Sequence, residues 1–149
     1  MIEKLIQEFK NLYKDVKEVI DKFPQDKREE ILFDKWSLKN VVAHLNHWCV
    51  LDLICFKALK EGKEPYWPPD IDEYNEQGVQ ARKNKTWNDV YNEFNTLLPK
   101  IILEYETLPS GLWSKRFWKA HKFTPLKFLE IDVDHYKNEH LPQLKKYTK

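Results

Sequence analysis

Two histidines, two aspartates and one tyrosine are the residues of this chain whose positions fit a chemical role. His44 and Asp52 lie on or beside the apolar stripe of the second predicted helix, and Asp132, Tyr136 and His140 lie in the same way on the last one. An unpaired charge on a buried face costs several kcal/mol, so the carboxylates need a partner or a function. Because helix bundles build metal and cofactor sites from inward side chains on facing helices, we expect these groups to meet in the core.

The last helix carries two histidines whose spacing decides whether both can hold one metal ion. At ~100° per residue, His135 and His140 are rotated by ~140° from one another, so a regular helix does not let both bind the same ion. Tyr136 and His140 are four apart and do share a face. A π-bulge near Pro142 would change this, because one inserted residue re-phases the turn, and such bulges favour functional sites. The predicted metal ligands are His44 and His140, with His135 joining them through such a distortion.

Each candidate also has an ordinary structural interpretation. His44 and His140 can be hydrogen-bonded histidines in a cleft between helices. Asp52 is a candidate catalytic residue, although the role of buried partner to a histidine, a tyrosine or a backbone group is commoner. Tyr136, the second candidate catalytic residue, can bind an oxyanion or a substrate, but a core tyrosine with its hydroxyl at the rim is the commoner case. Two further histidines are expected at the surface or at helix ends, namely His47 and His121.

Four long amphipathic helices are predicted to position these groups. Apolar residues recur at three- and four-residue steps in the ranges 2–23, 37–60, 86–108 and 124–144. Good helix starts precede the last three, at Ser37, Thr86 and Thr124. Pro99 is expected to kink the third helix, and Pro142 to distort the last turn of the fourth. No strand is predicted, so the expected fold is all-α: a four-helix up-down bundle with a long crossover between helices 2 and 3, forming a single domain over residues 1–149.

The crossover covers residues 61–86 and is long for a compact domain. Three prolines around Trp67 exclude a helix in its first half. Asp70 can cap a short helix in the second half. A connection of this length is either a passage along the bundle or a lid over the site.

Length, charge and cysteine placement limit the classes of function. The 149 residues suffice for one well-filled core and are short for two. Lys plus Arg number 25 and Asp plus Glu 24, so a net charge of +1 gives no global field that favours nucleic acid or an anionic membrane as a partner. Cys49 and Cys55 are badly placed for a disulfide, and two buried free thiols suit a reducing cytosol. The N-terminus lacks the apolar run of a signal peptide and no segment approaches the length of a membrane span, so the expected location is cytoplasmic.

One segment, from Trp113 to Phe123, alternates basic and aromatic side chains. Such a mixture can track a single-stranded nucleic acid by stacking and phosphate contact. The commoner case is a connection whose aromatic rings close the end of a bundle while its lysines stay in water. We therefore expect no nucleic acid partner.

A run on the second helix matches a known pattern at Trp36, Ser37, Ala43, His44 and Leu45. It resembles the Trp-Ser-x-x-x-x-x-Ala-His-Leu run that members of the DinB/YfiT-like helical-bundle superfamily often carry at this place. The resemblance extends over nearly the whole chain through three further short motifs: Asp72-Glu73-Tyr74-Asn75, Thr86-Trp87 and Glu139-His140-Leu141-Pro142-Gln143.

The resemblance implies a four-helix bundle with a long crossover, often dimeric, and a divalent ion such as Zn²⁺ or Ni²⁺ on three histidines. One ligand comes from the Ala-His-Leu run and two, four residues apart, come from the last helix. His44 matches the first ligand and His140 the last, but Tyr136 stands at the middle position, with His135 one residue out of register. The implied activities are thiol transfer, thiol-dependent isomerisation and hydrolysis of reactive small molecules.

Three functions follow as hypotheses. The first is a metal-dependent hydrolase or thiol transferase that acts on a small electrophile, in which a metal-bound water or thiolate attacks. The second is a metal-free bundle that binds a small molecule, or acts on it through Asp52, Tyr136 and His140 as acid, base and orienting groups. The third is an interaction module whose helix face forms a homodimer around a degenerate metal site. A small-molecule ligand and a homodimer are the expected partners, with no membrane.

Overall fold

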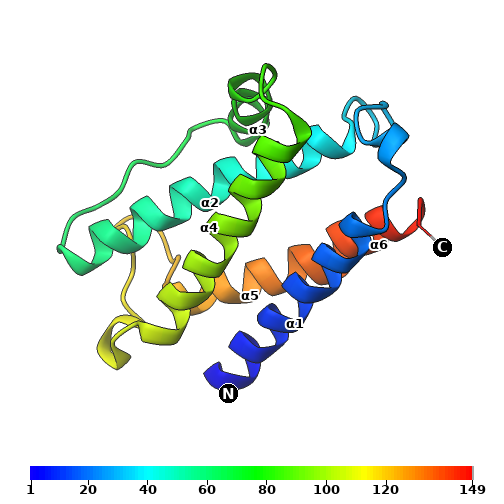
Figure 1. Cartoon of the computed structure of the whole chain (residues 1–149). Helices are drawn as coiled ribbons and strands as arrows, with labels where there is room; N and C mark the ends of the chain where they lie inside the picture. Colours follow the sequence, from blue (N-terminus) through cyan, green and yellow to red (C-terminus); the bar gives the residue numbers. More distant parts are fainter. Residues whose placement is uncertain (149) are drawn as a thin grey trace.

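The helices expected from the apolar periodicity are present in the computed structural model, which describes residues 1–148 (Figure 1). The order is α1 (Ile2–Asp21), α2 (Leu38–Lys60), α3 (Ile71–Ala81), α4 (Trp87–Thr107), α5 (Pro125–His135), a π-helical turn η3 (Tyr136–His140) and α6 (Leu141–Lys145), with short 3-10 turns at Gln25–Lys27 and Ser110–Leu112. No strand occurs among the described residues, so the all-α prediction is confirmed. The single domain of residues 1–149 stays a prediction, and its last residue, Lys149, lies outside the described part.

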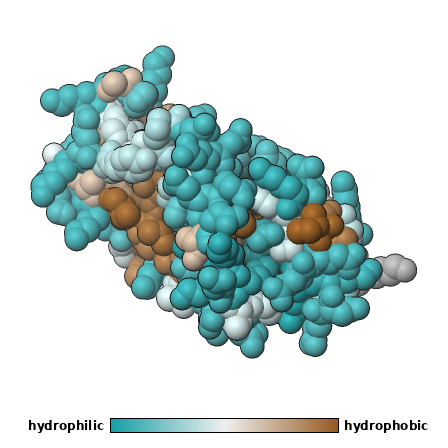
Figure 2. All heavy atoms as spheres, turned by 90° about the horizontal axis from the view of Figure 1, so that it is seen from above, coloured by the Kyte–Doolittle hydropathy of each residue, from teal (hydrophilic) through white to brown (hydrophobic). Residues whose placement is uncertain are grey.

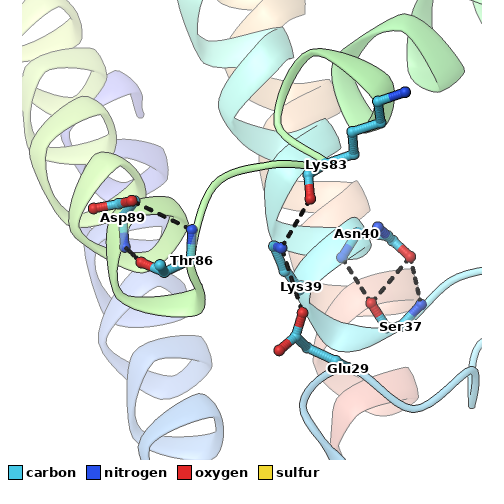
Figure 3. Close-up of polar contacts among 7 residues, drawn as sticks. All are labelled: Glu29, Ser37, Lys39, Asn40, Lys83, Thr86 and Asp89. Atoms are coloured by element: carbon cyan, nitrogen blue, oxygen red, sulfur yellow. Dashed lines mark hydrogen bonds and ion pairs between the residues drawn. The ribbon is translucent and has the colours of Figure 1, made fainter.

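Local capping explains where α2 and α4 begin (Figure 3). The Ser37 hydroxyl accepts a hydrogen bond from the Asn40 N–H at 3.2 Å, while the Asn40 side chain accepts one from the Ser37 N–H at 2.9 Å. Thr86 and Asp89 form the same reciprocal pair at the start of α4. Each pair satisfies backbone donors that a helix N-terminus leaves free, which is why the sequence locates these two starts correctly.

The long crossover makes α2 and α4 run in the same direction. Near their starts, the Asn46 amide donates to the Val90 carbonyl at 2.9 Å, and near their ends Lys60 pairs with Glu104. Two helices joined by a short loop would run antiparallel, so the chain must return along the bundle before α4 begins, and Figure 1 shows this return above α2. The helical bundle with a crossover between the second and third long helices is therefore confirmed, with directions up, down, down, up.

The second half of the crossover, α3, is fixed to α2 by close packing. The Tyr74 hydroxyl donates to the His47 carbonyl at 3.1 Å, and the two rings lie 4.3 Å apart between centroids. Gly78 is required at this contact, since a Cβ there would lie 2.6 Å from the His47 Cβ. His47 is therefore half-buried beneath α3, which corrects the expectation of a surface residue, whereas His121 is exposed as expected.

An ion pair closes the end of α3 onto α4. The Arg82 guanidinium, 9% exposed, donates two hydrogen bonds to the Glu93 carboxylate, at 2.7 and 3.1 Å. A bidentate pair of this kind is geometrically specific, so it holds α3 in a single orientation over α2. Local sequence patterns contain no signal for this pair, because its two residues belong to different elements.

The basic and aromatic segment of residues 113–123 closes one end of the bundle. Phe117 and Trp118 are buried, and the Trp118 indole N–H donates to the Pro65 carbonyl at 2.7 Å. The basic side chains of the segment are exposed, namely Lys115, Arg116, Lys119 and Lys122. The structure thus has the arrangement expected for a bundle-end connection, and it also leaves a local basic surface.

Figure 2 shows the molecule from above, relative to the view of Figure 1. This face is mostly hydrophilic and has a few apolar areas.

Helix α2 corrects the expectation that no segment approaches the length of a membrane span, because its 23 residues are long and apolar enough to cross one. More than half of these residues are buried inside the bundle, as in the core helix of a globular protein. Cys49 and Cys55 on this helix are buried and free, as expected. The cytoplasmic location stays a prediction.

Candidate functional site

A π-helical turn brings the two histidines of the last helix together. The Leu141 N–H donates to the Tyr136 carbonyl, five residues back, where an α-helix would use the residue four back. Pro142, which has no N–H, follows directly after this turn. The extra residue re-phases the helix, so the His135 and His140 rings lie 6.2 Å apart between centroids. Sequence reasoning named this distortion as the condition for His135 to join the site.

His44 approaches the same place from α2. Its ring centroid lies 5.5 Å from that of His140 and 4.7 Å from the Trp36 ring, which packs against it just before the helix cap. His44 and His140 are each 9% exposed, and among the described residues the Nδ1 atom of neither has a hydrogen-bond partner. Each of these Nδ1 atoms has less than 1 Å² of accessible surface, so a ligand in this place would meet the other ring nitrogen, Nε2, of each histidine.

Burial keeps both of these imidazoles neutral. Burial, and then the neighbouring His140, lowers the pKa of His44 to about 3. Burial, and then His135, lowers the pKa of His140 to about 4. The neutral imidazole is the form that binds a metal ion, so near neutral pH both rings are in the metal-binding state without losing a proton.

Glu139 adds a carboxylate beside the exposed histidine. Its Oε2 atom lies 2.9 Å from the His135 Nδ1, and both side chains are at least half exposed. The ligand atoms of His135, Glu139 and His140 all lie within 4.8 Å of one another, close enough for one metal ion. Sequence reasoning missed Glu139 as a site residue, although its four-residue spacing from His135 was the available signal.

The histidines form one wall of a partly open cavity of about 390 Å³ between α2, α5 and the crossover. Both residues predicted to be catalytic, Asp52 and Tyr136, line it as well. The remaining walls are largely apolar and aromatic, and include Trp48, Trp67, Phe123 and Phe128. A cavity of this size and lining is typical of small-molecule sites. The crossover contributes Trp67, Ile71 and Asn75, so it covers the cavity, while its movement as a lid stays a prediction.

Two carboxylates from facing helices, Asp52 on α2 and Asp132 on α5, line this cavity. Asp132 accepts a hydrogen bond from the Tyr105 hydroxyl at 2.6 Å. Burial raises the pKa of Asp132 to about 7, and burial together with the Asp132 charge raises the pKa of Asp52 well above its usual range. The charge that acts most strongly on Asp52 is therefore that of a second carboxylate, and the hydrogen bonds of the described residues include none between Asp52 and the expected histidine, tyrosine or backbone group.

The raised pKa of Asp132 predicts a specific dependence of stability on pH. The unfolded chain releases this proton near pH 3.8 and the folded chain near pH 7, so folding stability falls as pH rises between these values. Asp132→Asn is expected to remove this loss and to be more stable than the natural protein by roughly 2–4 kcal/mol above about pH 7. Urea unfolding at several pH values measures it, with the exposed Glu130→Gln as control. Parallel pH profiles for the natural protein and Asp132→Asn would contradict the prediction.

Tyr136 lies between the histidines and the core. Its ring contacts those of Phe9 and His140 edge-on, at 5.6 and 5.7 Å between centroids. Burial raises the pKa of its hydroxyl well above the usual value, so the phenol remains protonated near neutral pH. Tyr136 can therefore donate a hydrogen bond to a negatively charged oxygen in the cavity, which agrees with one of its two predicted roles.

Comparisons with known proteins support the fold. No protein-family model matches the chain, and no curated protein matches its sequence. The colibactin self-resistance protein ClbS, crystallised in complex with a double-stranded DNA, is similar with a TM-score of 0.84 and 16% identity, over 98% of this chain and 94% of that chain. An uncharacterised protein from Escherichia coli UTI89 is similar with a TM-score of 0.81 and 14% identity, over 99% of this chain and 92% of that one. At such identities the likeness shows the helical fold, and the family itself is not shown.

The ClbS complex overturns one expectation about partners. The near-zero net charge led to the prediction of no nucleic acid partner, yet a protein of this fold binds double-stranded DNA. The physical reason is that net charge sums over the whole chain, whereas nucleic acid contacts depend on the local charge of one face. The homodimer implied by the resemblance is not tested by a single chain.

Proposed function

We propose that this chain is a DinB/YfiT-like enzyme that holds a divalent metal ion on His44, His135 and His140 and acts on a small electrophilic molecule by hydrolysis or thiol transfer. The observation that carries the proposal is that the His140 ring lies 5.5 Å from the His44 ring and 6.2 Å from the His135 ring, between centroids, at the wall of a cavity of about 390 Å³. The π-helical turn accounts for the departure from the four-residue histidine spacing that the resemblance implies.

The residues present fit a Zn²⁺ or Ni²⁺ ion. Three nitrogen ligands around an open position are the usual donor set of a catalytic zinc site, and imidazole also suits nickel. The lowered pKa values of His44 and His140 support this fit, because the neutral imidazole is the form that binds a metal ion. Glu139 would orient His135 through its 2.9 Å contact or serve as a fourth ligand. When bound, the ion would supply an acidified water or thiol next to the cavity.

The chain's own groups would bind the substrate and move its protons. Asp52, whose raised pKa favours the protonated form, would hold a proton that it can give to a basic group of the substrate. The protonated Tyr136 hydroxyl would donate a hydrogen bond to the oxygen on which negative charge develops. The aromatic walls would exclude water from the reacting groups, which strengthens both interactions.

Metal content and turnover test the proposal together. Protein purified without a histidine tag is expected to carry about one equivalent of Zn or Ni, and chelation is expected to lower its Tm by several degrees because the ion binds the folded state. The loaded protein is expected to consume members of a panel of epoxides, activated esters and thiol acceptors, and the chelated protein is not. If the protein is purified without metal and its Tm does not change when Zn²⁺ or Ni²⁺ is added, the proposal is contradicted.

A second candidate function is the binding of double-stranded DNA, favoured by the exposed basic surface of residues 115–122 and by the DNA complex of ClbS. Charge reversal at Lys115 and Lys122 is expected to weaken binding of a short duplex about tenfold or more at ~50 mM salt, and to reduce the dependence of affinity on salt. Fluorescence anisotropy measures both, with charge reversal at Lys145 and Lys146 on the last helix as the matched control. Equal losses in the two variants, or no duplex binding by the natural protein, would contradict this function.

A further inference from the structure

The proposed reaction uses Asp52 but assigns no role to Asp132, the second carboxyl group that lines the same cavity. Among the described residues, neither carboxylate forms an ion pair with a lysine, an arginine or a histidine. Asp132 accepts one hydrogen bond, from Tyr105. Two carboxylates in one apolar cavity repel each other unless a proton or a cation lies with them.

Aromatic rings surround the space next to these carboxylates. Trp48 from α2 and Trp67 from the crossover lie 5.5 Å apart between ring centroids, and Trp67 lies 6.0 Å from Phe128 of α5. The indole N–H of Trp48 is occupied by the Asn75 side chain, which fixes the ring in place. Ring faces attract cations, most strongly when water is excluded.

The histidine wall of the cavity is polar as well. His44 and His140 line it with 9% exposure each. The cavity thus has imidazoles on the histidine wall and, at Asp52 and Asp132, two carboxyl groups without an ion-pair partner among the described residues, while its other walls are mostly apolar. A ligand that satisfies both must carry two different polar ends.

We propose that the cavity selects molecules that carry a protonated amine, which binds between Asp52 and Asp132 with the aromatic rings around its hydrocarbon part. The substrate class that follows is an aminated electrophile whose reactive end faces the histidines, and this part of the inference rests on the proposed function. The ammonium group has donors for both carboxylates and a charge that offsets their repulsion. A Ca²⁺ or Mg²⁺ ion fits less well, because it requires about six oxygen ligands and the walls here are mostly apolar.

A matched pair of small probes tests the amine preference without any metal. 2-Phenylethylamine and 2-phenylethanol have the same ring and chain and differ in the charged end. With nine heavy atoms each, such fragments bind with a Kd of about 10 mM or tighter. In chelator-treated protein followed by NMR titration, the amine is expected to bind at least about tenfold more tightly than the alcohol, which corresponds to about 1.4 kcal/mol. The shifted signals are expected to come from residues that line the cavity.

Variants separate this inference from the metal proposal. Asp52→Asn and Asp132→Asn keep the side-chain shape and are expected to reduce the preference for the amine to less than about threefold. Glu130→Gln, exposed on the outer face of α5, removes the same charge and is expected to leave the preference unchanged. Thermal unfolding of each variant reports whether it folds, and removing one of two repelling carboxylates is expected to raise the Tm.

The His44→Ala variant distinguishes a failure of the metal proposal from a failure of the amine site. If this variant loses metal binding and keeps the amine preference, both inferences are supported. If the natural protein binds no metal but prefers the amine, the proposed function fails and the amine site stands. Equal binding of amine and alcohol, no binding of the amine up to about 10 mM, or full retention of the preference in both asparagine variants would overturn the amine site.

Discussion

Replacing His44 with alanine is expected to lower the affinity for Zn²⁺ or Ni²⁺ by about 100-fold or more, the loss that already follows from changes beyond the ligands of a metal site. His44 is the ligand that α2 supplies, and the other two histidines come from neighbouring turns of one helix. Without His44 the ion would be held from a single side, with water in the place of a buried nitrogen. A three-histidine site would become a two-histidine site, which is rarely sufficient for tight zinc binding.

Calorimetric titration and the metal-induced change in Tm measure this effect. His121→Ala is the matched control, because His121 is exposed and lies in the connection before α5, away from the cavity. The metal-free form of each variant must be compared as well, since His44 packs against Trp36 and its removal leaves a gap there. If the His44→Ala protein binds the ion as tightly as the His121→Ala protein, α2 supplies no ligand to the metal site.

Local signals in the sequence predict the elements well and the long-range partners poorly. The starts of α2, α4 and α5 follow from Ser37, Thr86 and Thr124, because a capping side chain and the backbone it satisfies lie within four residues. The same local rule places a short helix after Asp70, whose carboxylate accepts from the Glu73 N–H at 3.1 Å. Helix positions could therefore be read from the chain without knowing what each helix packs against.

The pairing of side chains across elements could not be read in this way. The sequence shows that Asp52 interrupts an apolar stripe, but the charge that acts most strongly on it is that of Asp132, 80 positions away on another helix. The ion pair of Arg82 with Glu93 was missed for the same reason, although it fixes α3 over the site. Only the packing of the helices decides which inward side chains meet, and periodicity carries no information on that choice.

The prediction of no nucleic acid partner was wrong because it used the net charge of the whole chain. The sum of 25 basic and 24 acidic residues describes the whole molecule, while Lys115, Arg116, Lys119 and Lys122 share one exposed connection. The aromatic rings between them are buried, so stacking on single-stranded bases through Phe117 or Trp118 is excluded. Under the second candidate function, the exposed basic side chains would contact the phosphates of a duplex.

The geometry of a regular α-helix did not predict correctly how His135 and His140 lie on the last helix. His135 and His140 are five apart, and on a regular helix they would face different directions. The π-helical turn absorbs one residue, so the two rings face the same place as a four-residue spacing would on an α-helix. The spacing therefore resembles the expected pattern with one residue inserted, and a deletion tests this directly.

Removing Asn138 is expected to leave both the fold and the site intact. Asn138 is exposed inside the π-helical turn, and its one side-chain hydrogen bond is to the neighbouring Asp134. After its removal, His135 and His140 are four apart, the turn becomes an ordinary α-helical turn, and the segments on either side keep their faces. We expect a Tm within a few degrees of the natural protein and a metal affinity within about threefold of it.

The matched control is the removal of Glu130, an exposed residue in the regular part of α5. That deletion rotates everything before it by ~100° relative to everything after it, with no irregular turn to absorb the change. Phe128 and Leu129, 6% and 0% exposed, would turn out of the core, at a cost of about 3–5 kcal/mol each, which is comparable to the whole stability of a small domain. Thermal unfolding followed by circular dichroism compares the Tm of the two deletion variants, and metal titration compares their metal affinity. If the two proteins unfold alike, the π-helical turn is no re-phasing insertion, and His135 owes its place to some other feature of the chain.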